Sequence, residues 1–280
     1  MSTVKSNDGT QIAYSTAGNG PPVILVDGAL CYRKFGPAAK LAAVLSQQFT
    51  VFSYDRRGRG GSGDTPPYDA QREIEDLQAL IARAGGSACL YGVSSGAALA
   101  LEAAARGGSV NKLVLYELPF TEDPGRAAAS REYTAQLSRR LCAGQRSQAV
   151  KLFLHRVGVP APVITLMRFL PVWPKLTTIA HTLAYDDAIM SIATPGQPLP
   201  AQRWAAVTIP TLCLAGANSP SWLHDGLRAL AAALPSGQYR ALQGQNHVVK
   251  PKVHEPVLKG FFTSHGRAED VPHGAGQGAG

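Results

Sequence analysis

The stretch from residue 88 to residue 106 constrains the fold of this chain more than any other. An apolar run, Ala88–Tyr91, leads into Gly-Val-Ser-Ser-Gly, and small helix-forming residues follow. G-x-S-x-G between a strand and a helix is typical of a nucleophile elbow, in which a serine sits on a strained turn. Both glycines lack the Cβ atoms that would meet neighbouring backbone. The pattern predicts Ser94 as a nucleophile, with the N-terminus of a helix beside it to favour negative charge.

Strands and helices are expected to alternate around this turn. Continuous apolar runs indicate strands buried on both faces of a sheet, and amphipathic stretches between them indicate helices. After an N-terminal hairpin at 4–14, the expected strands are 22–26, 49–54, 88–91 and 112–116, and the expected helices are 35–47, 71–84 and 97–106. Such alternation predicts a parallel sheet with right-handed crossovers.

The pattern changes between residues 121 and 203, where strand-like runs are absent. Helical segments at 126–143, 146–156, 161–170 and 175–192 are separated there by Gly and Pro. The α/β pattern resumes with strands at 208–216 and 238–242 and helices at 222–234 and 253–262. We therefore expect an α/β core of residues 1–120 and 204–264, an inserted helical cap of residues 121–203, and a flexible C-terminal tail of residues 265–280.

This order of parts resembles the α/β-hydrolase fold with a cap domain, which has a mostly parallel central sheet flanked by helices. Three motifs carry the resemblance: G-x-S-x-G at 92–96, D-x-R-G-x-G-x-S at 55–62 and G-x-x-H at 244–247. The resemblance covers roughly residues 3–263. It implies that Ser94 is the nucleophile and His247 the general base, because a serine hydroxyl needs a base to remove its proton.

The acid of the implied catalytic triad departs from the commonest family pattern. Many relatives carry G-x-x-D after the strand that follows the cap, but residues 216–219 here read Gly-Ala-Asn-Ser. Some relatives, including certain haloalkane dehalogenases and lactonases, carry the acid after the preceding strand. That position is Glu117 in this chain, and it would give the protonated histidine its negative partner. Asp225 and Asp123 remain alternatives.

Two backbone N–H groups are expected to form an oxyanion hole, one from Ser95 and one from Ala29 in the loop after strand 22–26. Relatives often read His-Gly before the second donor, and this chain reads Asp27-Gly28, which keeps the backbone donor.

The turn at 55–63 is expected to support that loop through Asp55 and Arg57. Its glycines spell G-x-G-x-x-G, which in other proteins binds dinucleotides where a helix opens on them. Here Pro66 and Pro67 prevent such a helix, so no cofactor is expected.

Apolar residues of the expected cap and its surroundings should line an apolar pocket. The candidate substrate-binding residues are Leu30, Phe153, Met167, Phe169, Trp173 and Trp222. The first cap segments are also rich in arginine and lysine, which would suit an acidic partner such as a carrier protein or a carboxylate substrate.

Composition excludes several other functions. The net charge is +8, but no nucleic-acid-binding module or basic patch with interleaved aromatics is present. The four cysteines form no C-x-x-C pair, so no metal site is expected. The N-terminus is polar and no apolar run reaches the ~18 residues that span a membrane, which predicts a cytoplasmic protein.

The sequence thus predicts a cofactor-free serine hydrolase that cleaves a carboxylic ester or lactone of an apolar small molecule through an acyl-enzyme. A thioesterase, a C–C hydrolase or a cyclase of a biosynthetic, polyketide-like intermediate could use the same triad. A ligand-binding homologue without activity is the alternative from another class.

Overall fold

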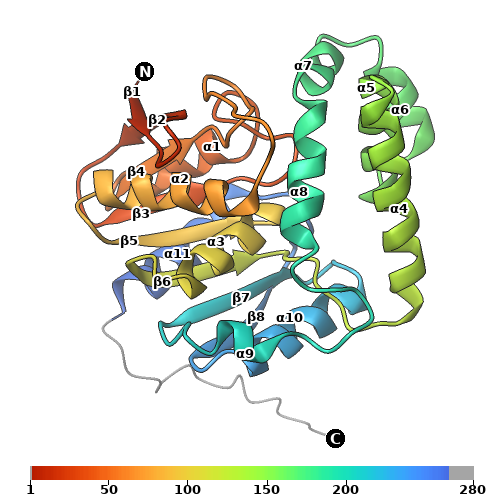
Figure 1. Ribbon diagram of the computed structural model, residues 1–280. Helices are drawn as coiled ribbons and strands as arrows, with labels where there is room; N and C mark the ends of the chain where they lie inside the picture. The colour runs from red at the N-terminus through yellow and green to blue at the C-terminus, as the bar shows by residue number, and fades with distance from the viewer. Residues whose placement is uncertain (1, 265–280) are drawn as a thin grey trace, which may run out of the picture.

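A computed structural model describes residues 2–264, which form an eight-stranded sheet with helices on both faces (Figure 1). The strand order is β1-β2-β4-β3-β5-β6-β7-β8. β1 and β2 are antiparallel, and the pairs from β4 to β8 are parallel. The strands are β1 (Ser2–Lys5), β2 (Gln11–Ala17), β3 (Pro22–Val26), β4 (Thr50–Tyr54), β5 (Ala88–Val93), β6 (Val110–Tyr116), β7 (Thr211–Gly216) and β8 (Gly237–Leu242).

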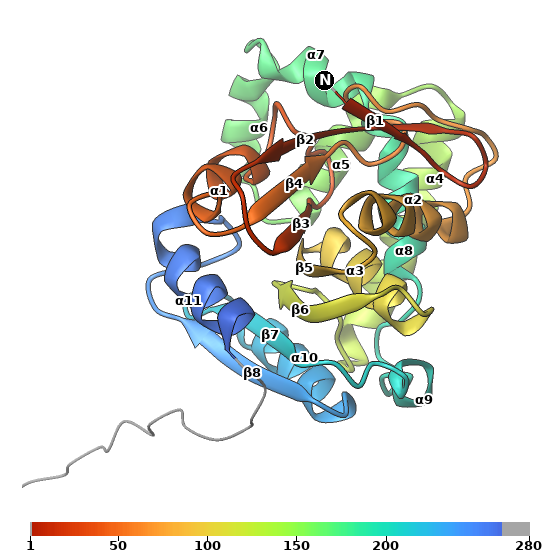
Figure 2. The same ribbon diagram turned by 90° about the vertical axis from the view of Figure 1, so that its left-hand side faces the viewer.

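Helices cover both faces of the sheet (Figure 2), and an apolar layer holds each set of helices against it. One face carries α2 (Ala70–Arg83), α3 (Ser95–Ala105) and α10 (Ser221–Ala233). The other carries α1 (Ala38–Leu45) and α11 (Pro251–Thr263). β3, β5 and β7 are buried along almost their whole length because helices cover both their faces, as continuous apolar runs predict.

In the sequence, a set of helices follows β6 and precedes β7, and these helices form their own apolar cluster. We call α4–α8 the helical insertion. It contains α4 (Gly125–Cys142), α5 (Arg146–Arg156), α6 (Ala161–Met167), α7 (Val172–Thr178), η1 (Ala180–Thr182) and α8 (Leu183–Met190), and a short α9 (Ala201–Trp204) follows. Figure 1 shows α8 against the core, with α4, α5 and α6 farther out.

Two expected helices differ from the observed ones. The segment 175–192 is divided into α7, η1 and α8, and the hydroxyl of Thr182 donates to the carbonyl of Ile179 (2.8 Å) at the division. α1 begins only at Ala38, because residues 32–35 form a tight turn in which Tyr32 and Phe35 pair through their backbones. The expected tail at 265–280 lies outside the described residues.

The parallel strands end at one edge of the sheet, which faces the helical insertion (Figure 1). The loops after β3, β5, β6 and β8 contain Ala29, Ser94, Glu117 and His247, respectively. In parallel sheets of this kind, ligands bind outside the carboxyl ends of the strands. Between residues 2 and 264, no helix combines the length and apolarity needed to cross a membrane.

Candidate active site

Ser94 occupies a strained turn between β5 and α3. Its backbone has φ 55° and ψ −124°, which a side-chain-bearing residue rarely adopts. A Cβ on Gly96 would lie 2.2 Å from the carbonyl oxygen of Val26, and one on Gly92 would lie 2.5 Å from the Cα of Ala97. The two glycines therefore let α3 start close against β3 and β5, and this packing holds the serine in its strained conformation.

Left-handed backbone at residues other than glycine is confined to three positions in residues 2–264. They are Leu30 (φ 57°), Ser94 (φ 55°) and Glu117 (φ 54°). Each directly follows, or lies in the loop after, a different parallel strand at the same edge of the sheet. Such strain costs on the order of 1–3 kcal/mol per residue and persists where the surrounding structure imposes it, typically at functional sites.

Glu117 is buried and is bonded on both of its carboxylate oxygens. Oε1 accepts from the backbone N–H of Gly216 (2.6 Å) and from the hydroxyl of Ser219 (2.8 Å). Oε2 lies 3.3 Å from Nδ1 of His247. The imidazole is 52% exposed, and its Nε2 has no partner among the described residues. Glu117 can therefore orient the ring, while Nε2 remains available to a neighbouring hydroxyl.

The other acids and histidines considered from the sequence lie elsewhere. Asp225 pairs with Arg228 on the surface, and Asp123 accepts from the backbone N–H of Gly125 at the start of α4. The buried His254 contacts the hydroxyl of Tyr91 (2.8 Å), and its burial lowers its pKa to about 4. His247 is thus the histidine that the structure brings to Glu117.

The loop after β3 packs directly against Ser94. A Cβ on Gly28 would lie 3.2 Å from the Cβ and 3.9 Å from the Oγ of Ser94. The next backbone N–H, that of Ala29, has no acceptor among the residues that the structure describes. Asp55 supports the loop by accepting hydrogen bonds from the backbone N–H (2.7 Å) and the guanidinium (3.0 Å) of Arg33, which belongs to the loop.

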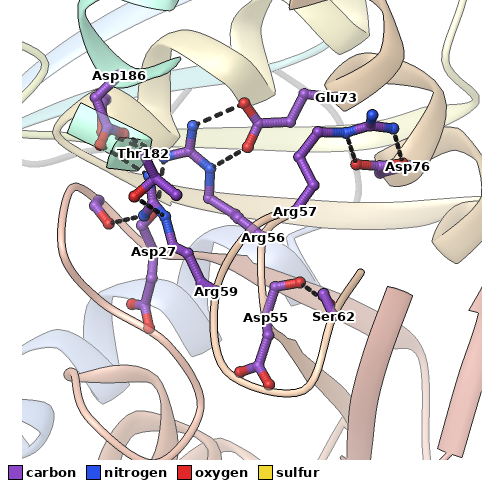
Figure 3. Close-up of polar contacts among 12 residues, drawn as sticks. Asp27, Asp55, Arg56, Arg57, Arg59, Ser62, Glu73, Asp76, Thr182 and Asp186 are labelled. Carbon is purple, nitrogen blue, oxygen red and sulfur yellow. Dashed lines mark hydrogen bonds and ion pairs between the residues drawn. The ribbon is translucent and has the colours of Figure 1, made fainter. Parts of the chain in front are cut away.

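A buried cluster of two arginines and two carboxylates lies behind this loop (Figure 3). Arg56 binds Glu73 of α2 through two hydrogen bonds (2.5 and 3.0 Å) and Asp186 of α8 through one (2.7 Å). Arg59 binds the other oxygen of Asp186 (2.8 Å). Asp186 is almost fully buried, but the nearby Arg59 and Arg56 hold its pKa below its usual range despite the opposing effect of burial.

The structure corrects the expectation that Arg57 supports the loop. Arg57 points away from it and binds Asp76 of α2 through two hydrogen bonds (2.7 and 2.8 Å) and Asp8 through one (3.0 Å) (Figure 3). Arg59 instead donates to the carbonyl of Gly28 (2.8 Å). No helix opens on the glycines of 58–63, since α2 starts only at Ala70.

The predicted substrate-binding residues lie in different surroundings. Leu30 and Trp173 are buried in the apolar cluster of the insertion, and Phe153 and Met167 pack against it. Phe169 is 83% exposed. Trp222, at the start of α10, lies under the guanidinium of Arg126 (3.8 Å to the ring centroid). Their part in binding a substrate remains a prediction.

A comparison with protein-family models decides the family. The model of the alpha/beta hydrolase family matches residues 18–251, which include the turn at Ser94, Glu117 and His247. The chain belongs to the α/β-hydrolase family.

Solved structures agree with this assignment. An α/β hydrolase from Sphaerobacter thermophilus is 44% identical, with a TM-score of 0.83 over 94% of this chain and 100% of that one. An enol-lactonase from Burkholderia xenovorans (21% identity, TM-score 0.65, 94% and 100% covered) and an esterase from a Rhodococcus species (20%, 0.63, 95% and 99%) share the fold. No curated protein matched the sequence.

Sequence reasoning missed three groups in this hydrolase. Ser219 stands where many relatives carry the acid, and a hydroxyl at that position could have signalled support for an acid placed elsewhere. Arg59 belongs to a motif with three arginines, a density that suggests buried partners. Asp186 had no sequence signal, because it lies 127 residues from Arg59 and meets it only in the fold.

Proposed function

We propose that this α/β hydrolase is a cofactor-free serine hydrolase that uses Ser94, His247 and Glu117 as a catalytic triad. The observation that carries the proposal is the left-handed backbone at Leu30, Ser94 and Glu117, which the fold imposes at one edge of the sheet. It coincides with a buried carboxylate bonded to the histidine. A merely structural role would not require strain at these three loops together.

In the proposed reaction, Ser94 Oγ attacks a carbonyl carbon while Nε2 of His247 removes the hydroxyl proton. Glu117 holds Nδ1 and stabilises the resulting imidazolium. The N–H groups of Ala29 and Ser95 bind the oxyanion as it forms. His247 then protonates the leaving group, and water, activated by the same histidine, releases the acyl group from Ser94.

The substrate class we propose is a carboxylic ester or lactone of an apolar small molecule. The fold is shared with proteins described as an esterase and an enol-lactonase, which supports this class over others. Leu30 lies in the loop after β3, and the apolar side chains clustered around it would accommodate an apolar acyl or alcohol group.

Labelling with a fluorophosphonate tests the nucleophile. We expect one covalent adduct, located on Ser94 by peptide mapping, together with turnover of p-nitrophenyl butyrate. Ser94→Ala should lose the adduct and lower kcat by ~10³-fold or more.

His247→Ala should lower kcat comparably, whereas His155→Ala, at an exposed histidine of α5, serves as the matched control and should retain wild-type rates. A folded wild-type protein that forms no adduct and turns over no ester would refute the proposal and favour a ligand-binding role. If the adduct and the turnover are found, a comparison of kcat/KM for esters, lactones and thioesters would assign the bond that is cleaved.

A further inference from the structure

The peptide unit between Gly28 and Ala29 has its two polar atoms in contrasting environments. The carbonyl oxygen of Gly28 accepts a hydrogen bond from the buried guanidinium of Arg59 (2.8 Å). The N–H of Ala29 belongs to the same planar unit and must point the opposite way, because the C=O and N–H of a trans peptide are antiparallel. Arg59 therefore fixes the direction of the Ala29 N–H by holding the other end of the peptide.

Arg59 is itself held by a carboxylate from the helical insertion. Its second terminal nitrogen binds Asp186 Oδ2 (2.8 Å), and its Nε donates to the hydroxyl of Thr182 (3.1 Å). Thr182 and Asp186 belong to η1 and α8, far from Arg59 in sequence. Arg59 is 1% exposed, so water does not compete for these bonds.

The same carboxylate reaches the side chain of Ser95, the residue whose backbone N–H is the other expected oxyanion donor. Oδ1 of Asp186 accepts from the hydroxyl of Ser95 (2.7 Å), the first residue of α3. Arg56 binds that oxygen too and lies 3.3 Å from the carbonyl oxygen of Asp27. Figure 3 shows Asp186 beside Arg56 and Arg59. Through Arg59 and through the hydroxyl of Ser95, this single side chain of the insertion supports both backbone segments beside Ser94.

We propose that Arg59 and Asp186 are positioning residues that aim the N–H groups of Ala29 and Ser95 at the oxyanion. The inference rests on the proposed function, since it assigns these groups to the same reaction. A cation bonded to the Gly28 carbonyl also polarises the peptide and makes its N–H a stronger donor. The helical insertion thereby contributes to the chemical step without touching the reacting atoms.

A charge-balanced variant tests the role with the least disturbance to folding. Arg59→Gln with Asp186→Asn removes one positive and one negative charge together. We expect kcat for p-nitrophenyl butyrate to fall ~10–100-fold, which is no more than the decrease in kcat that follows removal of a whole oxyanion donor. KM should change less than ~2-fold. The affinity for 1,1,1-trifluoropentan-2-one, which forms an oxyanion on Ser94, should fall by the same factor as kcat/KM.

The neighbouring buried pair provides the matched control. Arg57→Gln with Asp76→Asn removes a similar buried pair whose arginine belongs to the same turn, but Arg57 does not contact the loop after β3. This control should lower the thermal stability but should not lower the ketone affinity at constant KM. Arg59→Lys is the second variant if the double variant does not fold. It keeps the charge but cannot bind Gly28, Thr182 and Asp186 together, so kcat should again fall.

The outcomes separate this inference from the proposed function. Equal kcat and ketone affinity in wild type and in the folded Arg59 variants, with Ser94 still labelled by a fluorophosphonate, would overturn the positioning role alone. Absence of any adduct in the wild-type protein would overturn both. A parallel loss of kcat and ketone affinity at constant KM supports the inference.

Discussion

Ser219 donates a hydrogen bond to Glu117 from the position at which many relatives carry the acid itself. Ser219 stands at the fourth residue of the segment 216–219, where many relatives carry an aspartate. Its hydroxyl lies 2.8 Å from Oε1 of Glu117, and the N–H of Gly216 binds the same oxygen. In the proposed triad the acid lies at the end of β6, and Ser219 supplies a hydrogen-bond donor to it.

This geometry predicts that the acid can be moved back. Glu117→Asn should lower kcat ~10³-fold, because it removes the partner of the protonated histidine while tolerating the left-handed backbone. Adding Ser219→Asp should restore ~10-fold or more of that loss. The measurement is ester hydrolysis at saturating substrate. Glu117→Asn with Ser219→Asn is the uncharged control, and a Glu117→Asn/Ser219→Asp variant no faster than this control would contradict the prediction.

Among the elements, the contact between α3 and β3 matters most for the site. α3 is built from small residues and is almost wholly buried, so its first turn can approach the end of β3. At Gly96 the distance leaves no room for a side chain, since a Cβ would lie 2.2 Å from the carbonyl oxygen of Val26 and 2.6 Å from that of Asp27. Helix and strand positions are therefore coupled at this residue.

Gly96→Ala should accordingly lower the free energy of unfolding by about 3 kcal/mol, because β3 and α3 must separate to admit the methyl group. Gly260→Ala is the matched control in the interior of α11, where no atom lies within 4 Å of the added Cβ. It should raise the free energy of unfolding by about 0.5–1 kcal/mol through helix propensity. Urea unfolding followed by circular dichroism at 222 nm measures both changes, and equal effects would contradict the steric argument.

On the scale of the whole molecule, buried charge joins the core to the helical insertion. Arg56 and Arg59 face Glu73 and Asp186, so two guanidinium groups meet two carboxyl groups in the interior. Asp27 adds a fifth group nearby, with its Oδ2 unpartnered. Burial raises the pKa of Asp27 to about 7, although Arg59 and Arg56 oppose the rise, and Asp55 adds to it.

This raised pKa makes global stability depend on pH. The unfolded chain releases the proton of Asp27 near its ordinary pKa of 3.8, whereas the folded protein keeps it to about pH 7. Between these values the folded state binds more protons, so the free energy of unfolding falls as pH rises, and the loss is complete above pH 7. Asp27→Asn should remove this fall. The free energy of unfolding of Asp27→Asn, relative to that of wild type, should rise by about 2–3 kcal/mol between pH 4.5 and pH 8. Urea unfolding at the two pH values measures this difference, and a difference that does not change with pH would refute the assignment.

The sequence by itself determined the strand–turn–helix at Ser94, the buried parallel strands and the positions of Glu117 and His247 along the chain. The strand–turn–helix and the strands follow from local periodicity and from glycines at a tight turn, which act over a few residues, whereas Glu117 and His247 were expected from the resemblance to the α/β-hydrolase fold. Only the tertiary structure decided that Arg59 rather than Arg57 faces the loop after β3, and that Asp186 contacts Arg59 and Ser95. Adjacent side chains leave a turn in different directions, and a pairing across 127 residues depends on how α8 packs on the core. Such pairings leave no periodic trace in the sequence, because packing fixes them only after the elements have formed.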